Sequence, residues 1–274
     1  MDLTFAIVGQ GSVGSVLKRS LEKAEFGISA VLGRNDDLAS LPDSTGAVAI
    51  CTPDGSIAEI AEALSGTPLS WSGRVVFHVS GALTSEVLAP LAHLGALTLS
   101  FHPLSSYPPA TSGTSTRDLS GTTVALEGQP GAVDIMSDVA HRLGAVPVVL
   151  SIRQKGAYHL AASMASNFLV TLSGSVRAVL EATKLDPHLM DGLVKDTLSN
   201  LGSTSTSDAL TGPIARGDAD TVRLHLETLG TIAPNLIPLY KAMANTTIEI
   251  AFEAKRIDGA QRRRLRTVIG STPD

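Results

Sequence analysis

Two polar side chains follow consecutive apolar runs of the sequence and could take part in proton transfer. Ser80 ends the run that begins at Val75, and His102 ends the run that begins at Leu97, directly before Pro103. If these runs are neighbouring parallel strands, the hydroxyl and the imidazole lie at the same edge of a sheet. An imidazole exchanges a proton near neutral pH, as a carbonyl group requires when it is reduced. The alternative is that His102 is a hydrogen-bonded structural residue in front of a proline turn.

A second set of polar side chains recurs every four residues in a proline-free stretch, at Lys155, His159, Ser163 and Asn167. In a helix this spacing places them on one slowly drifting stripe. Small and apolar neighbours indicate that the stripe is not the outer face of a charged surface helix. Lys155 or His159 could donate a proton or polarise a carbonyl group, and Asn167 could hold the substrate or the nicotinamide carboxamide. The alternative is a satisfied polar seam between helices.

Arg216 is a candidate receiver for a substrate carboxylate. It lies in the segment LTGPIARGD, where a Gly/Pro turn precedes a helix that Asp218 is suited to cap. A guanidinium group beside a helix N-terminus is a good partner for a carboxylate. The alternative is that Arg216 pairs with Asp218 or Asp220 and only braces the loop.

The glycine-rich sequence GQGSVG follows the first predicted strand and opens a helix. Its first glycine permits a tight turn, the second lets the backbone approach a pyrophosphate, and the third lets helix and strand pack closely. The helix N-terminus attracts the negative charge. We therefore expect a dinucleotide to contact Gly9, Gln10, Gly11, Ser12, Val13 and Gly14. The alternative is a glycine-rich turn that binds nothing.

The end of the second predicted strand favours NADP(H) over NAD(H). An Asp or Glu would hold the ribose hydroxyl of NAD(H), but Arg34 stands there and can pair with a 2'-phosphate. Asp36 and Asp37 follow closely, so NAD(H) is kept as the alternative. Asp54 could simply cap a helix that begins near Ser56. Because they follow the third strand, we nevertheless expect three residues to line the cofactor: Thr52, Pro53 and Asp54.

The elements that would position these groups predict two domains. Through about residue 150, short apolar runs alternate with helical patterns, which is typical of a parallel sheet covered by helices on both faces. The remainder is helical, with no convincing strand. We therefore expect an α/β fold with a doubly wound Rossmann dinucleotide-binding domain over residues 1–150 and an all-helical substrate and dimerisation domain over residues 151–274. The predicted strands are 4–8, 28–32, 47–52, 75–79, 97–101, 122–126 and 146–150, and the later helices are 155–181, 187–201, 218–229 and 235–254.

Composition and charge argue against several classes of protein. A net charge of −5 and a pI near 5.8 lack the excess of basic residues that nucleic-acid binding requires. The arginines from Arg262 to Arg266 are interpreted as part of a solvated terminal helix. No apolar run is long enough to span a bilayer and no secretory signal is visible, so we expect a cytoplasmic protein without a membrane partner. Cys51 is the only cysteine, which excludes an intrachain disulfide and a zinc site of several thiolates. We expect no metal site.

Taken together, the motifs resemble a known family. GQGSVG, TPD, FHPLSSYP, KGAYHLAASMASNF and LTGPIARGD are similar to motifs of the Rossmann-like proteins with a C-terminal domain of unknown function. That family is similar to the 6-phosphogluconate dehydrogenase-like superfamily, which includes ketopantoate reductases, pyrroline-5-carboxylate reductases and prephenate dehydrogenases. The resemblance implies an N-terminal Rossmann domain and a helical domain that often forms homodimers. Ser80 and His102 are similar to the serine and histidine that prephenate dehydrogenases place near their substrate.

The sequence therefore predicts an NADP(H)-dependent oxidoreductase acting on a small carboxylate-bearing carbonyl, imine or alcohol metabolite. Ser80, Asn167 and Arg216 would bind this substrate, and His102, Lys155 or His159 would handle the proton. A ketopantoate reductase-like activity is the first candidate, although that family places an asparagine one helical turn after its lysine, where His159 stands here. The alternative from another class is a non-catalytic NADP(H)-binding sensor or regulatory protein.

Overall fold

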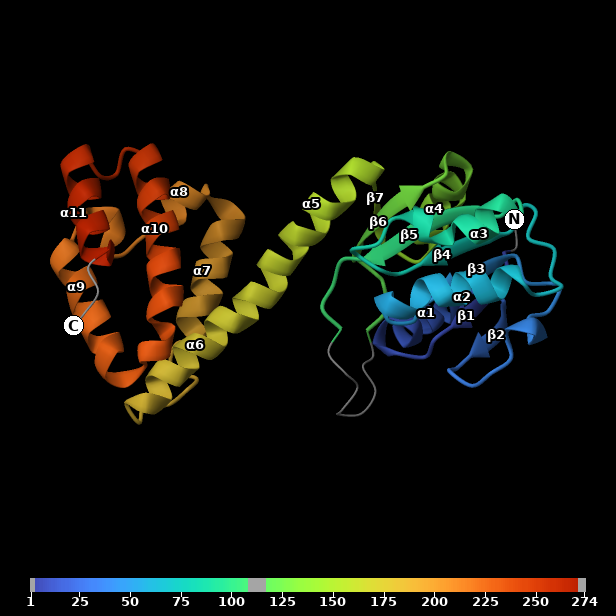
Figure 1. The fold of residues 1–274 in the computed structure, drawn as a ribbon, viewed down its shortest axis with the longest axis horizontal. Helices are drawn as coiled ribbons and strands as arrows, with labels where there is room; N and C mark the ends of the chain where they lie inside the picture. The colour runs from blue at the N-terminus through green and yellow to red at the C-terminus, as the bar shows by residue number, and fades with distance from the viewer. Residues whose placement is uncertain (1–2, 108–116, 271–274) are drawn as a thin grey trace. The chain divides into compact units, whose positions relative to one another are not determined.

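A sheet of seven strands is the frame of the N-terminal part of the protein (Figure 1). In the computed structural model, which describes residues 3–107 and 117–270, the strands pair in the order β2-β1-β3-β4-β5-β6-β7. The order reverses beside β1, and such a reversal is where open α/β sheets bind nucleotides. The bounds are β1 Phe5–Val8, β2 Ile28–Leu32, β3 Ala47–Ile50, β4 Val75–His78, β5 Leu97–Pro103, β6 Thr123–Gly128 and β7 Val146–Val149.

One pair of strands departs from the expected parallel sheet. β5 and β6 are antiparallel, with Phe101 opposite Leu126 and His102 opposite Ala125, whereas the other neighbouring pairs of described strands are parallel. The prediction of a parallel sheet is wrong at this pair, because an apolar run indicates that a strand is covered on both faces and carries no information on its direction. β1, β3, β4 and β5 still end at the same edge.

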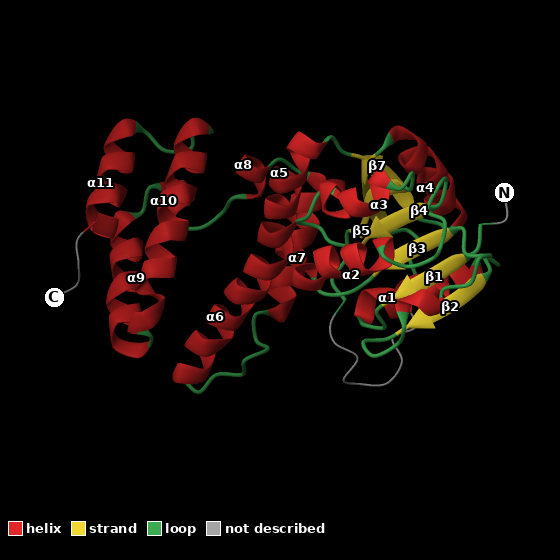
Figure 2. Ribbon diagram, turned by 45° about the vertical axis from the view of Figure 1, so that its right-hand side comes forward, coloured by secondary structure: helices red, strands yellow, loops and turns green. Residues whose placement is uncertain are grey.

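Helices cover both faces of this sheet (Figure 2). Alternate side chains of a strand point to opposite faces, so Phe5 and Ile7 pack with α1 and α4, whereas Ala6 and Val8 pack with α2 and α3. The doubly wound α/β arrangement is therefore confirmed. The helix bounds are α1 Ser12–Lys23, α2 Asp54–Ser65, α3 Ala89–His93 and α4 Pro130–Arg142.

The chain leaves the sheet through one long helical segment that begins at a capping box formed by Ser151 and Gln154. It consists of α5 (Ile152–Ser163), a π-helical turn (Met164–Phe168) and α6 (Leu169–Ala182). Internal contacts divide the chain into two units between Ser166 and Asn167, inside the π-helical turn, whereas the sequence pattern changes at residue 150. α5 therefore belongs to the unit that contains the sheet.

The second unit consists of helices throughout its described residues, which confirms the all-helical prediction. Its core includes Val222 and Leu226 of α9, Ile248 of α10 and Leu265 of α11. Arg262 and Arg266 both pair with Glu249, so the arginine run is partly held by ion pairs. Within the described ranges, none of the helices combines the length and the apolar character that a membrane span requires. The remaining bounds are α7 Asp191–Ser203, α8 Thr206–Ala209, α9 Ala219–Ile232, α10 Ile237–Glu253 and α11 Gly259–Gly270.

Candidate active site

The glycine-rich turn between β1 and α1 has the geometry of a nucleotide-binding loop. Gly9 has a φ of +105°, and a Cβ on it would lie 2.7 Å from the carbonyl oxygen of Cys51. A Cβ on Gly14 would lie 2.2 Å from the carbonyl oxygen of Gly9, so α1 can pack this closely on the strand only with glycine there. At Gly11, the N-cap of α1, a Cβ would meet nothing within 4 Å. The N-terminus of α1 is therefore open to an anionic group.

The other residues of this loop lie where the sequence predicts. Gln10 is exposed, and Ser12 and Val13 are half-buried at the start of α1. A hollow of about 260 Å³ adjoins the loop and is lined by Gly9, Gln10, Gly14, Ser15, Lys18 and Val31. The loop thus offers backbone and side-chain surface on the same side as the open helix end.

Arg34 follows β2 with its side chain exposed, and it forms no hydrogen bond or ion pair in the described part of the chain. The two nearby carboxylates accept hydrogen bonds from backbone N–H groups of their own loop. Asp36 accepts a hydrogen bond from the backbone N–H of Gly33 at 2.7 Å, and Asp37 caps the short 3-10 helix Leu38–Ser40. Arg34 is therefore the group at this strand end that remains available to a ligand.

Thr52, Pro53 and Asp54 connect β3 to α2 at the same edge. The Thr52 hydroxyl is buried and has no hydrogen-bond partner among the residues that the structure describes. Pro53 is the N-cap of α2, and Asp54 is its first residue. The expectation that Asp54 caps a helix near Ser56 is wrong, since the helix begins at Asp54 and the carboxylate accepts a hydrogen bond from the Ser80 hydroxyl at 2.8 Å.

Ser80 organises the turn that follows β4. Its hydroxyl oxygen accepts hydrogen bonds from the backbone N–H groups of Ala82 and Leu83, each at 3.1 Å. Its own N–H donates to Nδ1 of His78 at 3.2 Å, and Nε2 of His78 lies 3.2 Å from the carbonyl oxygen of Thr84. Burial lowers the pKa of His78 to about 4. Ser80 is itself buried, so its side chain holds the turn together.

Lys155 is the most deeply buried cation of the site, with an exposed fraction of 0%. Its ammonium group donates to the carbonyl oxygen of Ser80 at 3.2 Å and to the hydroxyl of Ser100 at 2.5 Å. Ser100 donates in turn to the same Ser80 carbonyl oxygen at 3.1 Å. Burial lowers the pKa of Lys155 to about 8, while the charges of Glu127 and Asp54 oppose this shift. Lys155 thus fixes α5 onto the ends of β4 and β5.

His102 and His159 come together beside Gly81. A Cβ on Gly81 would lie 2.8 Å from Nε2 of His102 and 2.7 Å from Nδ1 of His159. Nδ1 of His102 is hydrogen-bonded to the hydroxyl of Tyr158 at 2.8 Å, whereas Nδ1 of His159 is buried and has no partner within residues 3–107 and 117–270. Burial, assisted by the charges of Lys155 and His159, lowers the pKa of His102 to about 4. Burial raises the pKa of Tyr158 to about 12.

Two predicted substrate-binding residues belong to the second unit. Asn167 lies in the π-helical turn and is exposed. Arg216 is exposed in the 3-10 turn Ile214–Arg216, and the following Asp218 caps α9 by accepting a hydrogen bond from the N–H of Thr221 at 3.0 Å. Asp220 pairs with Arg223, and Asp218 does not lie within ion-pair distance of Arg216. The pKa of Asp218 is nevertheless lowered, first by its hydrogen bonds with Thr221 and also by the charge of Arg216, so an electrostatic contact between Arg216 and Asp218 remains.

Several members of this polar cluster were not singled out from the sequence. His78, Ser100 and Glu127 lie within strands whose other residues are mostly apolar, and all three are buried. Glu127 accepts hydrogen bonds from the backbone N–H and the hydroxyl of Ser85, each at 2.8 Å. A polar residue inside an apolar strand was the signal that could have found them. Tyr158 carried no such signal, because tyrosine is common on half-buried helix faces.

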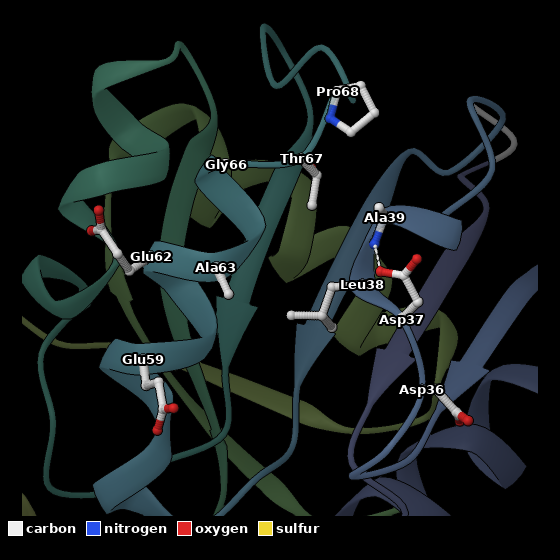
Figure 3. Close-up of a pocket in the computed structure, with 10 residues that line it drawn as sticks. All are labelled: Asp36, Asp37, Leu38, Ala39, Glu59, Glu62, Ala63, Gly66, Thr67 and Pro68. Carbon is white, nitrogen blue, oxygen red and sulfur yellow. Dashed lines mark hydrogen bonds between the residues drawn. The ribbon is translucent and has the colours of Figure 1, made fainter.

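A pocket of about 700 Å³ lies elsewhere (Figure 3). It opens between the 3-10 helix Leu38–Ser40 and α2, and its lining includes Asp36, Asp37, Glu59 and Glu62. These carboxylates would repel a phosphate or a substrate carboxylate. In the described part of the chain, no three His, Cys, Asp or Glu side chains are grouped so that they could hold a metal ion. The histidine and lysine cluster is therefore the better candidate for chemistry.

Comparison with known families assigns both parts of the chain. Residues 1–103 match a Rossmann-like domain, and residues 122–247 match DUF2520, a domain of unknown function. The chain thus matches a Rossmann-like domain model followed by the DUF2520 model, which confirms the resemblance drawn from its motifs. A search of curated proteins gave no match.

Solved structures share this fold over nearly the whole chain. A protein of Bacteroides fragilis, assigned as an NADP oxidoreductase, is 18% identical with a TM-score of 0.76 and covers 90% of this chain and 98% of its own. A Thermotoga maritima protein is 25% identical with a TM-score of 0.66, covering 92% and 99%. An imine reductase of Myxococcus stipitatus in complex with NADP+ is 13% identical with a TM-score of 0.59, covering 96% and 99%.

The lowered pKa values of His78 and His102 predict that the sheet unit loses stability in mild acid. Each folded-state pKa, about 4, lies below the ordinary value of 6.5, so the unfolded chain binds protons first as the pH falls. Stability is full above pH 6.5 and falls toward pH 4, by up to about 3 kcal/mol for each histidine. His102→Asn should remove its share of this pH dependence, measured by urea unfolding followed through the buried Trp71, the only tryptophan.

His93→Asn is the matched control, because His93 is exposed on α3. This variant should keep the pH dependence of the wild-type protein. If His102→Asn also kept it in full, the buried and neutral state of His102 would be contradicted.

Proposed function

We propose that the protein is an NADP(H)-dependent oxidoreductase acting on a small carboxylate-bearing carbonyl, imine or alcohol metabolite. The observation that carries this proposal is the presence of a nucleotide-binding turn and a pair of histidines at the same edge of one sheet. The Bacteroides fragilis and Myxococcus stipitatus proteins, which share the fold, are connected with NADP by their descriptions. The grouping of two histidines with a lysine beside the turn favours an enzyme over a sensor that only binds the nucleotide.

The residues present fit a nicotinamide dinucleotide. The open backbone at Gly11 would receive the pyrophosphate, and the unpartnered Thr52 hydroxyl supplies a buried polar group beside it. Arg34 would pair with the 2'-phosphate of NADP(H), because both nearby aspartates are held within their own loop. When bound, the nicotinamide supplies or accepts the hydride, and the chain supplies binding, orientation and protons.

The roles of the polar side chains follow from their accessibility. His102 stays neutral at pH 7 because its pKa is about 4, so it can donate a hydrogen bond but is a poor source of a proton. Lys155 is buried and already bonded to Ser80 and Ser100, so we assign it a positioning role. His159, whose Nδ1 has no partner, is the proton carrier in this proposal. Arg216, with Asn167 beside the same substrate, would hold its carboxylate.

Replacement of Arg34 tests the cofactor assignment. Arg34→Ala should weaken NADPH binding about tenfold or more, the usual loss for a hydrogen bond to a charged group, and should leave NADH binding nearly unchanged. Cofactor fluorescence at matched salt would measure both affinities. Lys23→Ala is the control, because Lys23 is a surface cation at the far end of α1 and pairs with Asp118. Equal binding of NADPH and NADH by the wild-type protein, unaffected by Arg34→Ala, would sink the assignment.

Replacement of Arg216 tests the carboxylate class of substrate. On the keto acid that supports the fastest NADPH oxidation, with ketopantoate as the first trial, Arg216→Ala should raise KM about tenfold or more with a smaller change in kcat. Arg223→Ala is the matched control, since this exposed arginine of α9 is paired with Asp220. Unchanged steady-state kinetics of Arg216→Ala would contradict the role.

We also propose that the protein is a homodimer formed through its helices. Large apolar side chains are exposed along α6 and α7, among them Val170 at 70% and Leu193 at 62%. Exposed apolar surface of this kind marks an interface, and two-fold homodimers are the commonest assembly.

Sedimentation velocity tests this assembly. Wild-type protein should sediment as a dimer and Leu193→Glu as a monomer, because the new carboxylate would be buried unpaired in the interface. Leu94→Glu, at an exposed leucine after α3, should remain a dimer. A wild-type monomer at tens of micromolar protein would rule the proposal out.

A further inference from the structure

Two ring nitrogens and one backbone N–H of the histidine pair remain without partners in the described chain. Nδ1 of His159 is buried and unbonded, and Nε2 of His102 forms no hydrogen bond, since the contact of this ring is made through Nδ1. The N–H of Gly81, which lies between the rings, also forms no hydrogen bond with the described residues. Buried polar groups in proteins nearly always have a partner, so the buried Nδ1 of His159, grouped with two further unbonded nitrogens, points to a ligand.

Nδ1 of His159 and Nε2 of His102 lie close enough together for a single atom to contact both. A Cβ on Gly81 would lie 2.7 Å from the first nitrogen and 2.8 Å from the second, so the nitrogens are no further apart than the sum of these distances. One oxygen atom can form hydrogen bonds with two nitrogens across such a span. Gly81 does not have a positive φ, so its backbone would accept alanine and only the space requires glycine.

Tyr158 determines which nitrogen of His102 carries the proton. The Tyr158 hydroxyl has Nδ1 of His102 as its partner, at 2.8 Å, and no other hydrogen bond in the described chain. If Nδ1 were the donor, the hydroxyl proton would have no acceptor among the described residues. This favours the hydroxyl as the donor to Nδ1, with the proton of the neutral ring on Nε2. His102 thus presents a hydrogen-bond donor beside Gly81.

Lys155 strengthens the third donor without reaching the ligand. The carbonyl oxygen of Ser80 accepts hydrogen bonds from Lys155 and from Ser100, and this carbonyl belongs to the same peptide group as the N–H of Gly81. Hydrogen bonds to the carbonyl polarise the peptide group and make its N–H a better donor. The positive charge of Lys155 also favours an electron-rich partner beside the rings.

We infer that Gly81 N–H, His102 Nε2–H and His159 Nδ1 form a binding site for the oxygen atom of a carbonyl substrate, and that this site selects ketones over imines. The inference rests on the proposed function and names its substrate class. A carbonyl oxygen accepts two or more hydrogen bonds, whereas a protonated imine is a cationic donor that these N–H groups and Lys155 would repel. Lys155 and Tyr158 are positioning residues in this site.

The protonation state of His102 is the first test. Imidazole nitrogen NMR of the isotope-labelled full-length protein at pH 7, without nucleotide, should show His102 protonated at Nε2 alone. Tyr158→Phe should produce a mixture of both tautomers, whereas His93→Asn should change nothing at His102. A wild-type His102 protonated at Nδ1, or a tautomer unaffected by Tyr158→Phe, would overturn the inference.

The substrate class is tested by titration with two rings of similar shape, 2-methylcyclopentanone and 2-methyl-1-pyrroline. The ketone should shift the signals of the Gly81 amide and of both imidazoles, and the imine should not. Gly81→Ala should abolish these shifts while leaving NADPH affinity within about twofold of wild type, because the added methyl group would collide with both rings and displace them. Equal shifts with both rings, or shifts retained in Gly81→Ala, would contradict the site.

His159→Asn is the second variant, in case Gly81→Ala does not fold. In this variant the apparent affinity for the ketone, measured from the chemical-shift changes, should fall about tenfold. An unchanged ketone affinity in this variant would overturn the role of Nδ1. The NMR measurements of ketone binding use no nucleotide, so they test the oxygen site independently of the cofactor. A failure of the wild-type protein to bind NADPH would count against the proposed function, whereas these spectra alone decide the oxygen site.

Discussion

The buried ammonium group of Lys155 is the interaction on which the rest of the site depends. Removing a charge from water costs several kcal/mol unless hydrogen bonds and opposite charges compensate. Here the Ser80 carbonyl and the Ser100 hydroxyl are the hydrogen-bond partners, and the charges of Glu127 and Asp54 act in the same direction. Ser80 follows β4 and Ser100 lies within β5, so satisfying the lysine fixes α5 against the sheet. Tyr158 and His159 follow Lys155 on that helix and take their positions from it.

The second constraint comes from the sheet. Strands that run in parallel end at one edge, and the chain uses that edge for both halves of the proposed reaction. The loop after β1 is open to an anion at Gly11, whereas at Gly9 and Gly14 a side chain would collide with nearby backbone atoms. The turn after β4 is held by Ser80, which is bonded to Asp54 from the β3–α2 connection. A hydrogen bond therefore joins the β3–α2 connection to the turn before the histidine pair, and the glycine-rich turn lies close against the same connection.

The sequence predicted the parts of this arrangement that depend on local rules. The glycine spacing, the arginine after the second strand and the seven apolar runs each have a short-range physical meaning, and the structure has these elements where they were expected. The stripe Lys155–His159 was also recognised, because a spacing of four residues fixes a helix face. The spacing could not show that Lys155 points into the sheet while His159 reaches Gly81, since the different directions of these two side chains depend on tertiary packing.

Other features depend on contacts between distant segments and were missed for that reason. The antiparallel direction of β6, the bond from Ser80 to Asp54 and the pairing of Tyr158 with His102 join residues far apart in the chain. No local pattern encodes such pairs. The apolar strands likewise concealed His78, Ser100 and Glu127, whose burial became meaningful only when their partners were placed.

A crystal structure of the protein with bound NADP+ tests the central claim most directly. The account predicts the pyrophosphate at Gly11, the 2'-phosphate at Arg34 and the nicotinamide C4 directed toward Gly81, leaving room for a substrate carbon at about 3–3.5 Å from it. A nucleotide bound elsewhere, or a nicotinamide turned away from His102 and His159, would contradict a shared site for hydride and proton transfer.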